Sequence, residues 1–184
     1  MKYYAIIVAG GKGARMKSKV PKQFLLLNGI PVLMHSIEKF FEAIPKIELI
    51  VVLPEDEMER WKALCRKHSF TIAHKTVAGG KMRFNSVKNG LEEVTDEGIV
   101  AVHDGVRPLA SVDLIRKCFA EAKKKGNAVP VIAVLDSLRI RKGSKSEIID
   151  RNAVAAIQTP QCFSTNILKK AYSLKMKKDV PAAL

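Results

Sequence analysis

Glycines and basic side chains are combined in a short segment near the start of the chain. The segment reads Ala9-Gly10-Gly11-Lys12-Gly13-Ala14-Arg15-Met16, and Lys22 follows in Pro21-Lys22-Gln23-Phe24. Glycines let backbone N–H groups approach phosphate oxygens because no side chain stands in the way. The guanidinium of Arg15 can bind phosphate through two hydrogen bonds, while Lys12 and Lys22 add point charges. These residue types at this spacing predict the binding of a polyphosphate.

Two familiar phosphate-binding motifs do not fit this segment. The dinucleotide fingerprint GxGxxG requires a small residue where Met16 stands, and the P-loop pattern GxxxxGK[ST] is absent. A plain tight turn between a strand and a helix remains the alternative interpretation of Gly10-Gly11.

Apolar runs alternate with amphipathic stretches along the chain. Strands are predicted at 3–9, 47–53, 71–77, 99–103 and 128–135, and helices at 32–41, 55–67, 83–94 and 111–125. In the last of these helices Ser111 is a candidate N-cap and Gly126 ends the helix. This repeated β-α-β order predicts an α/β protein: a Rossmann-like, three-layer α/β/α fold with a mostly parallel sheet.

Three polar segments follow predicted strands: residues 10–22, 79–86 and 104–107. Parallel sheets bind ligands at the carboxyl ends of their strands, so we expect these segments to lie at one edge. Asp104 has two interpretations there. It contacts a metal or a ribose, or it forms an Asx-turn before Gly105.

A different pattern occupies about 136–152. Leu138-Arg139-Ile140-Arg141 alternates, Lys142-Gly143-Ser144-Lys145 is typical of a turn, and Ile148-Ile149 resumes an apolar run. This pattern predicts a protruding β-hairpin arm. Because an isolated hairpin is marginally stable, we expect the arm to pack on another surface, such as a second subunit.

The 184 residues fit one domain, 1–184, and the formal net charge is +14. Charge of this size raises the alternative of a non-catalytic anion or RNA binder. However, the lysines at 123–125 and 175–178 are not interleaved with aromatic residues, so we expect no nucleic-acid partner. The apolar runs are too short to cross a membrane. Three widely spaced cysteines (Cys65, Cys118 and Cys162) indicate reduced thiols and a cytoplasmic location.

Several motifs in order carry a family resemblance. The first motif is the glycine segment with Lys22. The motifs that follow it are Gly79-Gly80 with Arg83 and Ser86, His103-Asp104-Gly105-Val106-Arg107-Pro108, Asp150-Arg151-Asn152 and Gln158-Thr159-Pro160-Gln161. Together they resemble the 2-C-methyl-D-erythritol 4-phosphate cytidylyltransferase family of the non-mevalonate isoprenoid pathway. The resemblance runs from the first strand to about Phe163.

The resemblance implies transfer of a cytidylyl group from CTP to 2-C-methyl-D-erythritol 4-phosphate, with Mg²⁺ as cofactor and a homodimer formed through the arm. By position it implies catalytic roles for Arg15 and Lys22, and CTP binding by Ala9, Gly10, Gly11, Lys12, Gly13, Gly80, Arg83, Ser86 and Asp104. Asp104 matches the metal-side carboxylate. The residues near the second substrate are Arg107, Ser137 and Arg151, of which the last two complete the neighbouring subunit's site.

Two departures from the family pattern are visible. Ser137 stands where threonine is common, and it keeps the hydroxyl. The C-terminal end of the family domain, with a phosphate-binding lysine and a second metal-side carboxylate, is expected to be missing from this sequence. Two related activities stay open: a ribitol-5-phosphate cytidylyltransferase, and a sugar-phosphate nucleotidyltransferase that uses UTP, GTP or dTTP.

Overall fold

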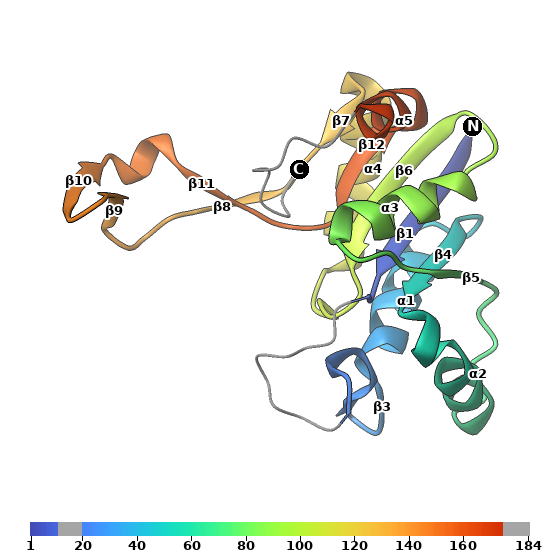
Figure 1. The fold of residues 1–184 in the computed structure, drawn as a ribbon. Helices are drawn as coiled ribbons and strands as arrows, with labels where there is room; N and C mark the ends of the chain where they lie inside the picture. Colours follow the sequence, from blue (N-terminus) through green and yellow to red (C-terminus); the bar gives the residue numbers. More distant parts are fainter. Residues whose placement is uncertain (11–19, 175–184) are drawn as a thin grey trace.

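A six-stranded sheet forms the centre of the molecule. The computed structural model describes residues 1–10 and 20–174. The strands follow the order β5-β4-β1-β6-β12-β7 (Figure 1). Their bounds are β1 (Lys2–Val8), β4 (Glu48–Leu53), β5 (Lys75–Ala78), β6 (Gly98–Asp104), β7 (Asn127–Ala128) and β12 (Gln161–Ser164). Strands β5, β4, β1 and β6 are parallel, and β12 is antiparallel to both β6 and β7. The predicted α/β class with a mostly parallel sheet is confirmed.

Among the described residues, five α-helices cover the two faces of the sheet. They are α1 (Val32–Ala43), α2 (Met58–Lys67), α3 (Arg83–Glu92), α4 (Val112–Lys125) and α5 (Thr165–Ser173). Alternate side chains of each strand point to opposite faces. In β1, Ile7 therefore packs into the core formed with α1, α2 and α4, and Ile6 packs into the core formed with α3 and α5. Two hydrophobic layers result, which is the three-layer arrangement predicted from the β-α-β order.

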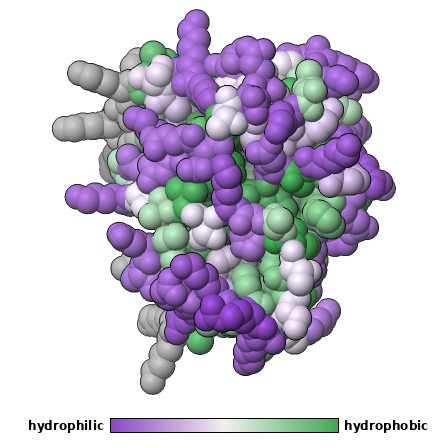
Figure 2. All heavy atoms as spheres, turned by 90° about the vertical axis from the view of Figure 1, so that its right-hand side faces the viewer, coloured by the Kyte–Doolittle hydropathy of each residue, from purple (hydrophilic) through white to green (hydrophobic). Residues whose placement is uncertain are grey.

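The surface beside β5 and α2 carries both hydrophilic and hydrophobic side chains. Hydrophilic groups surround a central band of hydrophobic ones on this face (Figure 2). Across the part of the chain that the structure describes, no helix is long and apolar enough to cross a membrane.

Helix α4 begins and ends where its sequence predicts. The Ser111 hydroxyl accepts a hydrogen bond from the Leu114 N–H at 3.2 Å, which satisfies one free donor of the first turn. Gly126 ends the helix with φ of 87°, a left-handed conformation that favours glycine. Short 3-10 helices and strands fill the connections: η2 (Lys22–Phe24), η3 (Glu55–Glu57), η4 (Arg151–Ala153), β2 (Leu26–Leu27) and β3 (Ile30–Pro31).

An arm extends away from the sheet (Figure 1). Its tip is the hairpin of β9 (Leu138–Lys142) and β10 (Lys145–Ile149), which confirms the predicted hairpin. Its stalk is the antiparallel pair of β8 (Val131–Ala133) and β11 (Ala155–Ile157). The arm is therefore longer than the segment 136–152 that the sequence indicates.

Two predicted strands are wrong in their bounds. The segment 128–135 is divided: residue 128 ends β7 in the central sheet, while 131–133 form β8 in the stalk. Pro130 lies between them and has no N–H to continue a ladder. The segment 71–77 pairs as β5 only from Lys75 onward. Apolar periodicity alone could not show where pairing starts, because pairing depends on the neighbouring strand.

Candidate active site

The three polar segments begin at one edge of the sheet. Beyond the end of β1, the Ala9 N–H donates to the Val52 carbonyl at 2.8 Å. Beyond the end of β6, the Gly105 N–H donates to the Val8 carbonyl at 2.9 Å. The Gly79 N–H donates to the Leu53 carbonyl at 2.7 Å in the same way. These backbone bonds hold the ends of β1, β4, β5 and β6 in register, so the chain leaves all four strands at the same edge.

Ser86 joins the glycine pair after β5 to the first turn of α3. Its Oγ accepts a hydrogen bond from the Gly80 N–H at 3.1 Å and donates to the Met82 carbonyl at 3.2 Å. A methyl group on Gly10 would lie 3.4 Å from the same Oγ, so the two glycine segments approach each other here. A methyl group on Gly80 would overlap Asn85. Glycine is therefore required at position 80 because the backbone passes against the helix.

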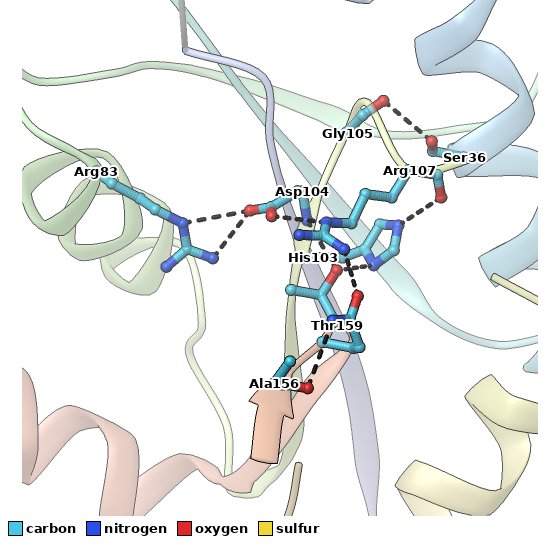
Figure 3. A network of polar contacts seen from close by, with 9 residues as sticks. Ser36, Arg83, His103, Asp104, Gly105, Arg107, Ala156 and Thr159 are labelled. Atoms are coloured by element: carbon cyan, nitrogen blue, oxygen red, sulfur yellow. Dashed lines mark hydrogen bonds and ion pairs between the residues drawn. The ribbon is translucent and has the colours of Figure 1, made fainter. Parts of the chain in front are cut away.

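Asp104 lies between two arginines (Figure 3). Its Oδ1 accepts hydrogen bonds from Arg83 Nε at 3.3 Å and Nη2 at 3.0 Å. Its Oδ2 accepts a hydrogen bond from Arg107 Nε at 3.1 Å. Arg83 is the first residue of α3 and Arg107 follows β6, so the carboxylate ties two elements together. Both oxygens of Asp104 thus bind side chains.

His103 lies in β6, buried next to Asp104. Its ring is fully buried, and the ring centroid lies 5.0 Å from that of Phe40. Nδ1 lies 2.9 Å from Thr159 Oγ1, and Nε2 lies 3.2 Å from the Arg107 carbonyl oxygen. Burial lowers the pKa of His103 to about 4, although the Arg107 carbonyl acts in the opposite direction. The imidazole is therefore neutral at physiological pH. The ring packs in the core and makes hydrogen bonds through both nitrogens.

Lys22 begins η2 and is exposed. The next two residues anchor it, because Gln23 and Phe24 are buried and the Phe24 ring stacks on Trp61 at a centroid distance of 6.1 Å. Trp61 is thus a core residue. The other basic and glycine residues of the first motif, Gly11, Lys12, Gly13 and Arg15, lie outside the described residues.

Ser137 and Arg151 lie on the arm rather than beside Asp104. Ser137 directly precedes β9, and Arg151 begins η4. Arg151 Nη1 donates to the Leu135 carbonyl at 2.7 Å, which holds the two sides of the arm together. Because the arm points away from the body of its own chain, the structure does not bring these two residues to Arg107 within one chain (Figure 1).

Two residues of this edge have no assigned role in the sequence analysis. Gln158 Oε1 accepts a hydrogen bond from Arg107 Nη1 at 2.6 Å, and Thr159 Oγ1 contacts both His103 and the Asp104 N–H. Their types carry no periodic signal, and only the return of the chain from the arm brings them here. The motif Gln158-Thr159-Pro160-Gln161 drew attention to both residues, but it gave neither a role.

A metal ion could use one carboxylate at this edge. The ranges 1–10 and 20–174 contain no group of three or more His, Cys, Asp or Glu side chains that could hold a metal. Mg²⁺, however, is commonly held by one or two carboxylates together with the phosphates of a substrate. Asp104 fits that pattern when a triphosphate supplies the other ligands.

The arrangement suits the binding of two phosphorylated molecules. Backbone donors and Ser86 lie on the side of β5, Arg83 and Asp104 lie at the centre, and Arg107 lies toward the arm. A fixed cation with hydrogen-bonding partners already in place stabilises anionic groups without further reorganisation.

Comparisons with known proteins show the family of this chain. The family model IspD, described as 2-C-methyl-D-erythritol 4-phosphate cytidylyltransferase, matches residues 3–183. Relatives with that name include a protein of Bacteroides fragilis, 47% identical over 91% of this chain and 77% of its own length. Another, from Porphyromonas gingivalis, is 48% identical over 93% of this chain and 76% of its own length.

Solved structures give the same result. The crystal structure of 4-diphosphocytidyl-2C-methyl-D-erythritol synthase from Anaerococcus prevotii has a TM-score of 0.79 and 26% identity, covering 97% of this chain and 80% of that chain. The bifunctional IspDF of Campylobacter jejuni has a TM-score of 0.82 and 26% identity, covering 99% of this chain and 46% of that chain. The chain therefore belongs to the 2-C-methyl-D-erythritol 4-phosphate cytidylyltransferase family.

Proposed function

We propose that this protein transfers the cytidylyl group of CTP to 2-C-methyl-D-erythritol 4-phosphate and releases pyrophosphate, a step of non-mevalonate isoprenoid precursor synthesis. Family membership supports this reaction. The observation that carries it is the pairing of Arg83 and Arg107 across Asp104, at the edge where the glycine segments meet.

The reaction is an attack of the substrate's phosphate oxygen on the α-phosphorus of CTP. Both reactants are anions, so their repulsion and mutual orientation dominate the barrier. No nucleophile from the protein is needed, because positioning and charge stabilisation can carry phosphoryl and nucleotidyl transfer. Lys22 and Arg15 neutralise charge on the α-phosphate and on the departing pyrophosphate.

The nucleotide lies on the side of β1 and β5 in this proposal. Backbone groups of Ala9, Gly10 and Gly80 contact the cytidine and its phosphates, together with Ser86 and Arg83. The hydrogen bond from the Gly80 N–H to the Ser86 hydroxyl supports this role because it fixes the loop after β5 against α3. The segment with Gly11, Lys12 and Gly13 wraps the triphosphate. Glycine-rich backbone is well suited to such contact.

Mg²⁺ is the proposed cofactor, with Asp104 as its carboxylate ligand. When bound, the ion neutralises charge on the phosphate oxygens. Asp104 already has two guanidinium partners, at 3.0 Å from Arg83 Nη2 and 3.1 Å from Arg107 Nε. We therefore expect the triphosphate, which adds negative charge, to bind together with the cation.

The second substrate lies toward the arm. Arg107 binds its phosphate, and Ser137 and Arg151 of a second copy complete the site. The exposed apolar side chains of the arm support a homodimer, because Leu135 and Ile148 are 81% and 80% exposed in the single chain. A cytoplasmic location is also proposed, on the basis of the free cysteines among the described residues.

Nucleotide and acceptor panels test the reaction. Pyrophosphate release is measured with CTP, UTP, GTP or dTTP, each combined with 2-C-methyl-D-erythritol 4-phosphate or ribitol 5-phosphate. We expect activity with CTP and the methylerythritol phosphate. Preference for ribitol 5-phosphate or for another nucleotide would replace the proposed substrate pair.

The role of Lys22 is tested by Lys22→Ala. Removing one preorganised charge stabiliser lowers kcat by about a hundredfold or more. The matched control is Lys46→Ala, because Lys46 is an exposed lysine that precedes β4, at the opposite edge of the sheet. Near-normal kcat in Lys22→Ala at saturating substrates would remove Lys22 from the catalytic role.

A further inference from the structure

The guanidinium of Arg107 is oriented by two partners of different charge. Its Nε donates to the Asp104 carboxylate at 3.1 Å, and its Nη1 donates to the Gln158 amide oxygen at 2.6 Å. The planar guanidinium is fixed once two of its nitrogens are bound. Within the described residues, Nη2 of Arg107 has no hydrogen bond. One donor nitrogen therefore remains available for an anion.

Gln158 lies where the arm returns to the sheet. It directly follows β11, and its N–H donates to the Pro130 carbonyl at 2.8 Å, which closes the base of the stalk. Its Nε2 lies 3.4 Å from the Ala156 carbonyl oxygen, which orients the amide. Donation from Nε2 leaves Oε1 facing Arg107 as an acceptor. The side chain thus connects the base of the arm to the arginine.

Thr159, the residue after Gln158, fixes this part of the chain to the central sheet. A carbonyl can only accept, so His103 Nε2 carries the proton that binds the Arg107 carbonyl, and Nδ1 accepts from the Thr159 hydroxyl. The Thr159 oxygen also lies 3.5 Å from the Asp104 N–H. Thr159 is 7% exposed. The backbone that carries Gln158 is therefore anchored to the end of β6, the strand from which Arg107 follows.

We propose that Gln158 is a positioning residue that holds Arg107 ready for the phosphate of the second substrate. This inference rests on the proposed function. Asp104 already binds Nε of this guanidinium, and the amide oxygen of Gln158 adds a second contact without a second negative charge that would compete with the incoming phosphate. Since Arg107 is 45% exposed, its side chain would otherwise sample many rotamers and lose that freedom on binding. Because Gln158 already restricts the Arg107 side chain, less conformational entropy is lost when the phosphate binds.

The proposal is tested by measuring KM for each of the two substrates in the variant Gln158→Leu. Gln158→Leu keeps the size of the side chain but removes the acceptor oxygen. It is expected to raise KM for 2-C-methyl-D-erythritol 4-phosphate by about tenfold, the scale of one hydrogen bond to a charged group. KM for CTP should change less than about twofold, because the hydrogen bonds of Ser86 and Gly80 are untouched. A general structural defect would change both constants.

A double-mutant cycle separates positioning from a direct contact with substrate. In an Arg107→Lys background, Gln158→Leu should have no further effect on KM for the acceptor, because lysine cannot make the same forked contacts. Additive effects would overturn the proposal. The control Asn166→Leu removes an exposed side-chain amide of α5 that binds Glu97 at 3.0 Å, and it leaves the Gln158–Arg107 contact in place. It should leave both constants within about twofold.

The outcomes also separate this inference from the proposed function. If the unaltered protein does not turn over CTP and the methylerythritol phosphate, the proposed function fails. If it is active and Gln158→Leu has unchanged or equally changed constants, the positioning role alone fails. Should Gln158→Leu not fold, as judged by circular dichroism, Gln158→Ala replaces it, since alanine also lacks the acceptor.

Discussion

The carboxylate of Asp104 accepts two hydrogen bonds from the guanidinium of Arg83, at 3.3 Å from Nε and 3.0 Å from Nη2. Asp104 ends β6 and Arg83 begins α3, and the two residues are 21 positions apart in the sequence. Asp104 also binds Arg107 through its other oxygen. A single negative charge therefore sets the position of two positive ones at the edge of the sheet.

Asp104→Asn removes this charge with little change in shape. We expect kcat with CTP to fall by about a hundredfold, because both arginines lose their ionic partner and the proposed metal loses its carboxylate. Steady-state pyrophosphate release measures the effect. The matched control, Asp113→Asn, changes an exposed aspartate in the first turn of α4 and should leave kcat unchanged. Normal kcat in Asp104→Asn would exclude Asp104 from the reaction.

Ser86→Ala removes the hydroxyl that binds the Gly80 N–H. Because Ser86 is 3% exposed, the loss of the two hydrogen bonds of its hydroxyl should lower the free energy of unfolding by about 1–2 kcal/mol, measured by urea denaturation. KM for CTP should rise as well, because the loop after β5 is no longer fixed. Ser173→Ala is the control: that serine also donates to a helix carbonyl but is exposed on α5. Equal effects of the two substitutions would contradict the prediction.

The buried imidazole of His103 should make the free energy of unfolding decrease in mild acid. Burial lowers the pKa of the folded-state imidazole to about 4, below the ordinary value of 6.5. Between these two values the unfolded chain binds a proton that the folded chain does not. The stabilisation is thus complete above pH 6.5 and decreases as the pH falls toward 4, by about 3 kcal/mol in total.

Urea denaturation at several pH values between 4 and 7 measures this loss. His103→Gln cannot take up the proton, so its free energy of unfolding should change less across the same window. Carboxylates titrate in both proteins, and the difference between the two curves therefore isolates the imidazole. Parallel curves would show that His103 does not titrate as its burial predicts.

Ile148→Asp tests the arm as a dimer contact. Ile148 is 80% exposed at β10, so in an isolated chain the substitution should change stability little. In a dimer a buried, unpaired carboxylate is costly, and sedimentation should show a shift to monomer with a loss of activity. Lys145→Ser, at the turn end of the same hairpin, is the control and should keep the dimer. A protein that sediments as a monomer without any substitution would contradict the proposed assembly.

Local patterns in the sequence determined several elements of this protein. The Ser111 and Gly126 caps of α4 and the alternation in β1 are decided by neighbouring residues, through turn chemistry and side-chain period. The hairpin at the arm tip follows from a turn of four residues in the same way. The order of the motifs also identified the family. Such features depend on a few adjacent residues, so they are readable without a structure.

Only the tertiary structure decided which residues meet at the site. Gln158 contacts Arg107 across 51 positions, and Thr159 contacts His103 across 56, because the chain leaves the sheet, forms the arm and returns. The division of 128–135 between sheet and stalk has the same origin, since each half pairs with a strand that occurs later in the chain. Pairing between distant segments is set by the packing of the whole molecule. Neither residue type nor periodicity encodes it locally.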